Sequence, residues 1–344
     1  MTKPIRIGVI GAGGNTRAKH IPGFQAIPGV EIAAVCNRSR ESGEKAAREF
    51  GIRRVATDWR EVVGAPDVDA ICIGTWPYLH AELGIATLRA GKHVLTEARM
   101  ARDLAEAQAM LAEAEKHPQL VAQIVPAPMS LPFDATVAEL LAAGTLGEVR
   151  EVHATCTHGG LADAAVPFSW RQDTELSGKN TLYLGIYYEM VLRWLQREPE
   201  SVVADAAVFT PQRRDEAGKL RAVGIPESVT VLGRYADGAR LVLHCSGVET
   251  SAPRSELRLN GTKAGLRLDL GKGELRLQPR GGAEQRVEIA PAKRGDWRVE
   301  ADFIDSIRDG RPVRLTDFAT GVKYMRFTDA VWESWTHGGQ RVAL

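Results

Sequence analysis

Hydrophobic positions in the first third of the chain form short continuous runs, each followed by a stretch with helical character. The runs at residues 5–12, 30–37 and 69–75 have the length and apolar continuity of strands buried on both faces of a parallel sheet. The stretch after the second run is amphipathic and closes at Gly51, as a helix does. This alternation predicts an α/β fold built on a doubly wound parallel sheet.

The pattern changes near Pro126, where three prolines fall within residues 125–133. Such a composition is typical of a crossing between domains. Further on, polar and apolar residues alternate with a period of two, and Asn260-Gly261 is predicted as a hairpin turn. One strong helix is predicted at 181–198, and amphipathic segments return at the end of the chain. The second half is therefore expected to be a mostly antiparallel sheet backed by helices.

Composition narrows the class of protein. A chain of 344 residues is long enough for two domains. With 44% hydrophobic residues, 25% charged residues and a net charge of +1, the composition is that of an ordinary globular protein. This charge balance does not indicate a nucleic acid or a membrane as partner. The four cysteines are far apart, so no metal site is predicted and a reducing compartment is favoured. With no signal peptide pattern and no apolar run of about 20 residues, a cytoplasmic location is expected.

The first predicted strand leads into a glycine-rich turn. Gly11, Gly13 and Thr16 occupy the three positions of a G-x-G-x-x-G motif, and Gly14 and Asn15 complete the loop. Gly11 would permit the tight turn and Gly13 the approach of a pyrophosphate to the backbone, at the start of a helix. This context predicts dinucleotide binding, against the alternative of a purely structural turn.

The end of the second predicted strand indicates which dinucleotide is bound. A protein that prefers NAD usually places an acidic residue there for the ribose hydroxyls. This chain has Asn37, Arg38, Ser39 and Arg40 instead, and guanidinium and hydroxyl groups suit a 2′-phosphate. NADP(H) is therefore favoured, with NAD(H) as the alternative. The same residues could also be a polar loop in which Ser39 or Ser42 caps the next helix.

The order of these motifs resembles the Gfo/Idh/MocA oxidoreductases. The matching segments are GVIGAGG (8–14), TWPYLH (75–80), AGKHVLTE (90–97), GTLGEVREV (144–152), WRQDTELSG (170–178) and ADFIDSIRDGRPVRLTDF (301–318).

The resemblance implies a Rossmann dinucleotide-binding domain at 1–124 and an α/β domain for substrate binding and oligomerisation at 125–344, whose C-terminal helices pack back toward the first domain. It also implies a homodimer or homotetramer formed through the open sheet. The implied substrate is a small molecule, most often a sugar, a cyclitol or a derivative. Cofactor contacts are implied for Thr75, Trp76, His80, Glu97, Trp170 and Arg171.

The family's Glu-Lys-Pro motif is altered in this chain. Glu97 is kept, but Ala98 stands at the position of the lysine and Arg99 at that of the proline. Alanine cannot carry a proton or a charge. Arg99 is expected in a first helical turn, solvated or in an ion pair, or binding an anionic substrate group.

The family's helix pair is altered as well. The resemblance places Tyr183 at the usual Asp position and Tyr187, four residues later, at the His or Tyr position. Residues at this spacing share one helical face. Tyr187 is predicted as the proton carrier, a role that suits a phenol whose pKa is lowered by its surroundings. The alternative is that both rings pack into the core.

Two further residues could replace the missing groups. His80 follows the implied cofactor segment and is predicted either as a proton carrier or as a structural residue at a helix start. Lys179 stands where the family has glycine and could supply the lost ammonium from another direction.

Three functions remain open at this point. The first is an NADP(H)-dependent oxidoreductase acting on a small hydroxyl, carbonyl or imine compound, since hydride transfer is the cofactor's chemistry and needs mainly positioning. The second is a non-redox enzyme (lyase, hydrolase or epimerase) that retains its cofactor. The third is a binding protein with a degenerate active site.

Overall fold

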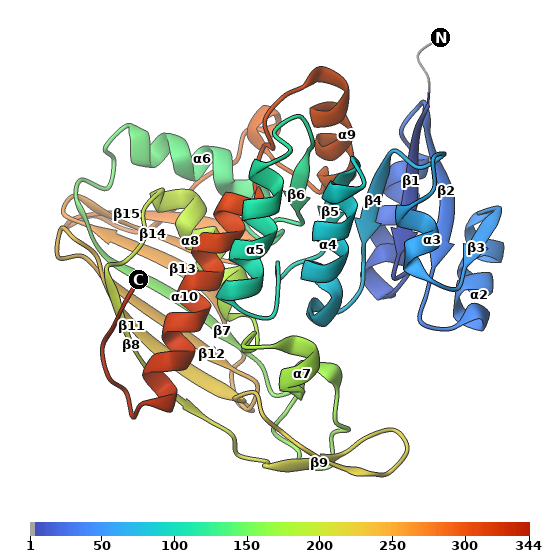
Figure 1. Cartoon of the computed structure of the whole chain (residues 1–344). Helices are drawn as coiled ribbons and strands as arrows, with labels where there is room; N and C mark the ends of the chain where they lie inside the picture. Colours follow the sequence, from blue (N-terminus) through green and yellow to red (C-terminus); the bar gives the residue numbers. More distant parts are fainter. Residues whose placement is uncertain (1–3) are drawn as a thin grey trace. The chain divides into compact units, whose positions relative to one another are not determined.

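The computed structural model describes residues 4–344, which divide into two compact units. Unit 1 comprises the chain up to Pro126 together with Arg298–Val322, and unit 2 comprises Ala127–Trp297 and Lys323–Leu344. The division near Pro126 falls within the proline-rich stretch, and helix α10 (Phe318–Thr336) belongs partly to each unit (Figure 1). None of the described helices is both long enough and apolar enough to cross a membrane.

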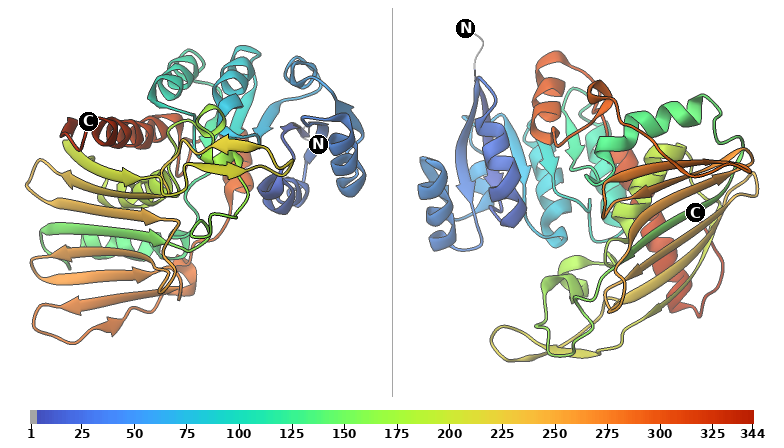
Figure 2. Two further views of the ribbon diagram at one scale, coloured as in Figure 1. Left: turned by 90° about the horizontal axis from the view of Figure 1, so that it is seen from below. Right: turned by 180° about the vertical axis from the view of Figure 1, so that it is seen from behind.

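Unit 1 is a six-stranded sheet in the order β3-β2-β1-β4-β5-β6, with every pairing parallel. The chain order reverses between β1 and β4, so the predicted doubly wound sheet is confirmed. Helices α4 and α5 contact each other on one face, and α1 and α9 on the other (Figures 1 and 2). The strands are β1 (Ile5–Ile10), β2 (Val30–Cys36), β3 (Arg54–Ala56), β4 (Ala70–Ile73), β5 (His93–Thr96) and β6 (Ala122–Ile124). The helices are η1 (Thr16–His20), α1 (Ile21–Gln25), α2 (Arg40–Phe50), α3 (Trp59–Val63), η2 (Pro77–Leu79), α4 (His80–Arg89), α5 (Leu104–Glu115) and α9 (Val299–Asp309).

The apolar runs of the sequence form the core of this sheet. All four residues of β4 are buried, as are the last four of β1. Strands covered by helices on both faces have no polar alternation, which is why continuous apolar runs identified them.

Unit 2 is built on a nine-stranded sheet in the order β16-β15-β14-β13-β7-β12-β11-β8-β17, in which only β7 and β12 pair in parallel. The predicted, mostly antiparallel second sheet is therefore confirmed. The strands are β7 (Val149–Thr157), β8 (Ser201–Ala207), β11 (Ser228–Arg234), β12 (Arg240–Ser246), β13 (Ser255–Gly261), β14 (Ala264–Asp269), β15 (Glu274–Pro279), β16 (Gln285–Arg286) and β17 (Val342–Ala343), with β9 (Gln212–Arg214) and β10 (Leu220–Ala222) as a separate hairpin. The helices are α6 (Leu131–Ala142), η3 (Trp170–Gln172), α7 (Thr174–Ser177), α8 (Leu184–Leu195) and η4 (Pro291–Lys293).

The two faces of this sheet differ. Helix α8 contacts β7 and β12, and Ser334 of α10 accepts a hydrogen bond from the backbone of β8, so these helices cover one face. Burial in β11 alternates strictly, with Val229 and Val231 inside and Thr230 and Leu232 outside. The second face carries no helix of the unit's described residues (Figure 2).

One predicted turn was wrong. Asn260 and Gly261 are the last residues of β13, and the turn falls on residues 262–263. A side chain at Gly261 would clash with the carbonyl oxygen of Leu146, so this glycine is required by close packing and not by a turn.

Candidate functional site

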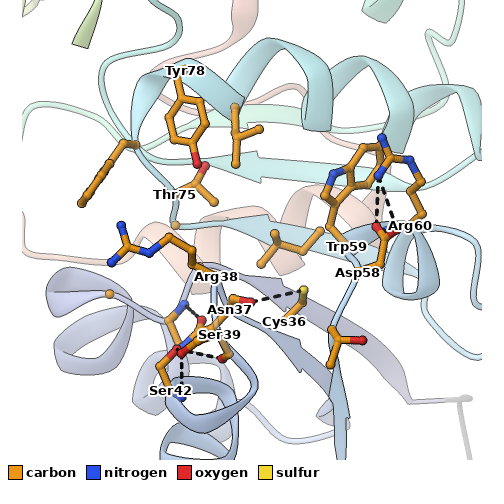
Figure 3. Close-up of a pocket in the computed structure, with 18 residues that line it drawn as sticks. Cys36, Asn37, Arg38, Ser39, Ser42, Asp58, Trp59, Arg60, Thr75 and Tyr78 are labelled. Atoms are coloured by element: carbon orange, nitrogen blue, oxygen red, sulfur yellow. Dashed lines mark hydrogen bonds and ion pairs between the residues drawn. The ribbon is translucent and has the colours of Figure 1, made fainter. Parts of the chain in front are cut away.

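A cavity of about 600 Å³ opens at the carboxyl ends of β1, β2 and β4 in unit 1. Ligands of open α/β sheets bind at this edge, where the strand order reverses. Figure 3 shows the residues around it: the end of β2 and the start of α2 lie opposite Thr75 and Tyr78. The lining residues are Ile10, Gly11, Ala12, Gly13, Cys36, Asn37, Arg38, Ser39, Ser42, Thr57, Asp58, Trp59, Arg60, Gly74, Thr75, Trp76, Tyr78 and Leu79.

The glycine-rich turn forms one wall of this cavity. Gly11 has a φ of +91°, a conformation that L side chains rarely adopt, and a Cβ there would lie 2.6 Å from the backbone nitrogen of Thr75. Thr16 is buried, and its hydroxyl oxygen occupies the space that a side chain at Gly74 would need. Thr16 thus fills the packing position of the motif's third glycine and packs directly against Gly74.

Asn37 is tied to the same turn. Its Oδ1 accepts a hydrogen bond of 2.7 Å from the backbone nitrogen of Ala12. The amide oxygen accepts this bond, and the Nδ2 group of the same side chain can only donate.

The neighbouring residues add positive charge and a helix cap. The guanidinium carbon of Arg38 lies 5.5 Å from the centre of the Trp76 ring. Ser39 is the N-cap of α2, and its oxygen accepts from the backbone nitrogen of Ser42 at 3.3 Å. The predicted capping role of Ser39 is therefore observed within a segment that also lines the cavity.

Sequence reasoning missed the wall formed after β3. Arg60 stacks over Trp59 with 4.4 Å between the guanidinium carbon and the ring centre, and Asp58 accepts from the Arg60 side chain at 3.2 Å. Hydrogen bonds from the backbone and from the side chain of Arg60 keep the pKa of Asp58 below its usual value. The signal that could have placed this turn is the capping box of Asp58 and Glu61, which marks a helix start after a short strand.

Several residues predicted to bind the cofactor are not among those that line this cavity. Gly14, Asn15, Thr16, His80 and Glu97 do not line the cavity. Trp170 and Arg171 belong to unit 2, where the Arg171 guanidinium lies 4.3 Å from the Trp170 ring centre.

Glu97 ends β5 within a buried network of unit 1. Its Oε1 accepts from Asn15 Nδ2 at 2.5 Å and lies 3.0 Å from His20 Nε2. The other ring nitrogen of His20 lies 2.5 Å from Glu300 Oε1 of α9. Burial alone would lower the pKa of His20, but the hydrogen bonds to Glu300 and Glu97 outweigh it and raise the pKa to about 9. Burial alone would raise the pKa of Glu97, but the contact with the His20 imidazolium outweighs burial and lowers this pKa.

His80 is fully buried at the start of α4. Its Nδ1 lies 2.9 Å from the carbonyl oxygen of Arg99, and its Nε2 lies 3.0 Å from that of Thr75. Burial lowers the pKa of His80. This geometry favours the structural alternative, in which His80 joins two loops at the edge of the sheet.

Arg99 departs from expectation. It is 8% exposed and precedes α5, which begins at Leu104, so it is neither solvated nor in a first helical turn. Its carbonyl is one of the two that contact His80.

The three remaining predicted residues lie in unit 2. Tyr187 is 2% exposed and its hydroxyl lies 2.5 Å from Ser255 Oγ, and burial raises its pKa well above the usual value. Tyr183 directly precedes α8 and is 46% exposed. Lys179 Nζ is paired with Asp329 Oδ2 at 2.5 Å.

Comparisons with known proteins agree with this architecture. Residues 5–124 match the family model described as "Oxidoreductase family, NAD-binding Rossmann fold", and residues 135–267 match the GFO/IDH/MocA C-terminal domain.

Individual relatives are distant. The chain is 28% identical over 258 residues to levoglucosan dehydrogenase of Pseudarthrobacter phenanthrenivorans. This match covers 68% of this chain and 65% of the relative, which is slightly less than two thirds of the relative's length. It is 40% identical over 111 residues to 1,5-anhydro-D-fructose reductase of Ensifer adhaerens, covering 32% of this chain and 33% of the relative. A solved structure of levoglucosan dehydrogenase with NADH and levoglucosan superposes with a TM-score of 0.89 at 23% identity, covering 99% of both chains. An inositol dehydrogenase homolog with NAD+ from Azotobacter vinelandii gives 0.85 at 19% identity, covering 100% of this chain and 98% of the other. At such identities these two structures support the fold alone.

Proposed function

Because the chain belongs to the Gfo/Idh/MocA family of NAD(P)-dependent oxidoreductases, we propose that it is an NADP(H)-dependent enzyme of the cytoplasm. It would transfer a hydride to or from a small hydroxyl or carbonyl compound, such as a sugar, a cyclitol or a related imine. The dehydrogenase and reductase relatives act on anhydrosugars, which makes that class the first to test. The wide spacing of the four cysteines along the sequence favours a reducing compartment.

The contact between Asn37 and Ala12 is the observation that supports the choice of NADP(H). A carboxylate at this position would accept hydrogen bonds from both ribose hydroxyls of NAD. Asn37 instead accepts from Ala12 through its oxygen and offers a neutral Nδ2 donor, without the negative charge of a carboxylate. Together with the guanidinium of Arg38, it provides donors and positive charge, which suit a 2′-phosphate.

The cavity fits such a cofactor through its backbone. Gly11 and Gly13 line it without side chains, and the bulk of a Cβ at Gly11 would fill the space beside Thr75. A bound nicotinamide would supply the hydride donor or acceptor. The chain's own contribution is then to orient the substrate and to handle one proton at the reacting oxygen.

Tyr183 is the better supported proton carrier of the two tyrosines. The Tyr187 hydroxyl is buried, bonded to Ser255, and has a raised pKa. Tyr183 is half exposed at the start of the same helix. We therefore assign proton transfer to Tyr183 and a packing role to Tyr187, whereas the sequence favoured Tyr187.

Turnover with defined compounds tests the proposal. Purified protein is mixed with NADP+ or NAD+ and levoglucosan or myo-inositol, and separately with reduced cofactor and 1,5-anhydro-D-fructose, while the nicotinamide absorbance is followed. The expected result is an absorbance change that is faster with NADP(H). Product formed without added nucleotide would instead favour the cofactor-retaining, non-redox enzyme. Absence of any turnover or binding across the panel would contradict the proposal.

We also propose that the helix-free face of the unit 2 sheet joins two or four copies of the chain. Leu232 of β11 lies on this face and is 52% exposed. Its cross-strand neighbours Val203 and Val242 extend the apolar surface across three strands. Contiguous apolar surface of this kind is typical of subunit contacts.

A further inference from the structure

A further cavity of unit 1, of about 650 Å³, opens at the amino ends of β5 and β6, which begin at His93 and Ala122. The cavity proposed to hold the dinucleotide lies at the carboxyl ends of β1, β2 and β4. Because all strands of this sheet run parallel, the two cavities lie at opposite edges of it. A volume of this size is typical of small-molecule sites.

The walls of this amino-edge cavity are mostly apolar. Leu111 comes from α5, Ile307 from α9 and Phe318 from the start of α10. Residues 118–121, which precede β6, and residues 310–313, which follow α9, complete the wall. Apolar walls favour a ligand with an apolar body, because the surfaces that meet on binding leave water.

His93 supplies the cavity with a hydrogen-bond donor. Its Nδ1 accepts from the backbone nitrogen of Val121 at 2.9 Å, so Nδ1 carries no proton. Burial lowers the pKa of His93, which keeps the ring neutral at neutral pH with its single proton on Nε2. Within the described residues 4–344, no acceptor contacts Nε2. The ring lines the cavity and can therefore donate to a ligand there.

The charged residues that line the cavity favour a neutral ligand. Asp317 Oδ1 accepts from the backbone nitrogen of Thr320 at 2.8 Å, and the Arg311 guanidinium lies 2.9 Å from Asp309. Glu115 is exposed. Two carboxylates and one guanidinium give no excess of positive charge to hold an anion. A cationic group, in turn, offers no acceptor to the imidazole N–H.

We propose that the amino-edge cavity binds a small neutral molecule that has an apolar body and one carbonyl or hydroxyl oxygen. The apolar body lies against the walls from α5, α9 and α10, and the oxygen accepts a hydrogen bond from His93 Nε2. The site is separate from the dinucleotide cavity, so the ligand binds with or without a nucleotide. This binding function goes beyond the proposed oxidoreductase activity and does not depend on it.

Ligand-observed NMR on the full chain tests the proposal. The probes are N,N-dimethylbenzamide, benzamide and caprolactam, which are neutral, carry one ring and accept through an amide oxygen. Their dissociation constants are measured by saturation transfer, with and without saturating NADPH. We expect at least one probe to bind with the same Kd in both conditions. Isopropylbenzene, which resembles N,N-dimethylbenzamide but has no acceptor, should bind more weakly.

Three variants locate the bound probe. Ala114→Trp places an indole inside the cavity and should abolish binding. Ala112→Trp is the matched control, because Ala112 lies on the same helix, is exposed and does not line the cavity. His93→Asn keeps an oxygen that can accept from Val121 but removes the Nε2 donor, so the Kd should rise about fivefold.

Each other result overturns the inference. Failure of all three probes to bind rejects the site, and so does displacement of a probe by NADPH, because that probe would occupy the dinucleotide cavity. Unchanged affinity in Ala114→Trp, with folding checked by thermal melting, would place the probe elsewhere. If Ala114→Trp does not fold, His93→Asn decides, and an unchanged Kd in that variant rejects the site. Turnover of sugars is measured separately, so the proposed function stands or fails independently.

Discussion

His20 Nε2 lies 3.0 Å from Glu97 Oε1, and this contact joins the helix that follows the glycine-rich turn to the end of β5. The second ring nitrogen contacts Glu300, so one imidazolium serves two carboxylates. All three side chains belong to unit 1, and His20 is fully buried. The position of Glu97 therefore depends on the charge of a residue 77 positions earlier.

Removing this imidazole should destabilise the protein strongly. His20→Phe would leave Glu97 and Glu300 without their common cation, and breaking a buried ion pair costs about 3–5 kcal/mol. Urea unfolding should show this loss in the free energy of unfolding. Arg17→Ala, which removes the half-buried pair with Glu49, is the comparison and should cost about 1 kcal/mol or less. Equal losses in the two variants would contradict the network's role.

The same network predicts a pH dependence of stability. The pKa of His20 is raised from 6.5 to about 9, so its contribution is complete below pH 6.5 and is lost as the pH rises through about 9. At about 1.4 kcal/mol per pH unit, the loss is about 3 kcal/mol. Glu97, whose pKa is lowered, contributes in the opposite sense and loses its share as the pH falls below its usual range. Thermal melting between pH 6 and 10 should show the alkaline loss in the natural protein and its absence in His20→Asn.

Cofactor preference should respond to single changes at the end of β2. Asn37→Asp keeps an acceptor for Ala12 but adds a negative charge, so the Kd for NADPH should rise about tenfold or more and that for NADH should fall. Arg38→Ala should weaken NADPH binding more than NADH binding. Arg40→Ala is the control, because Arg40 is 70% exposed, pairs with Glu44 and does not line the cavity. Unchanged ratios of the two affinities in Asn37→Asp would count against the NADP(H) assignment.

The two tyrosines should behave differently when their hydroxyls are removed. Tyr183→Phe should lower kcat by about 100-fold or more, as expected for a proton-transfer group. Tyr187→Phe removes the buried contacts of the hydroxyl with Ser255 and Cys156 and should cost about 1–2 kcal/mol of stability with little change in kcat. The reverse result would return the catalytic role to Tyr187, as the sequence first predicted.

Association through the open sheet should depend on Leu232. Leu232→Glu would place a charge in the apolar centre of the contact and shift the protein toward a monomer in light scattering at fixed concentration. Leu220→Glu, on the separate β9–β10 hairpin and equally exposed, is the matched control. A monomeric natural protein, or a Leu232→Glu variant with unchanged mass, would rule out this interface.

The architecture was predictable because burial on both faces leaves a direct mark on the sequence. The runs that became β1, β2 and β4 have no polar alternation, and the glycine at position 11 could be explained by turn geometry alone. The wall around Trp59 was not predictable in the same way, since β3 has only three residues and gives no periodic signal.

Roles of individual polar residues were harder to predict. The sequence left His80 as either a proton carrier or a structural residue, because it shows a titratable group but not the two backbone carbonyls that contact it. Tyr187 looked available because helical spacing fixes its direction but not its depth.

Arg213 contacts the loop at 161–166 only through main-chain oxygens. These hydrogen bonds do not depend on which side chains the loop carries. Ala162 and Ala164 of this loop are exposed. Selection, natural or in the laboratory, can therefore exchange these side chains while the loop keeps its shape. A library randomised at these two positions should therefore be rich in folded members.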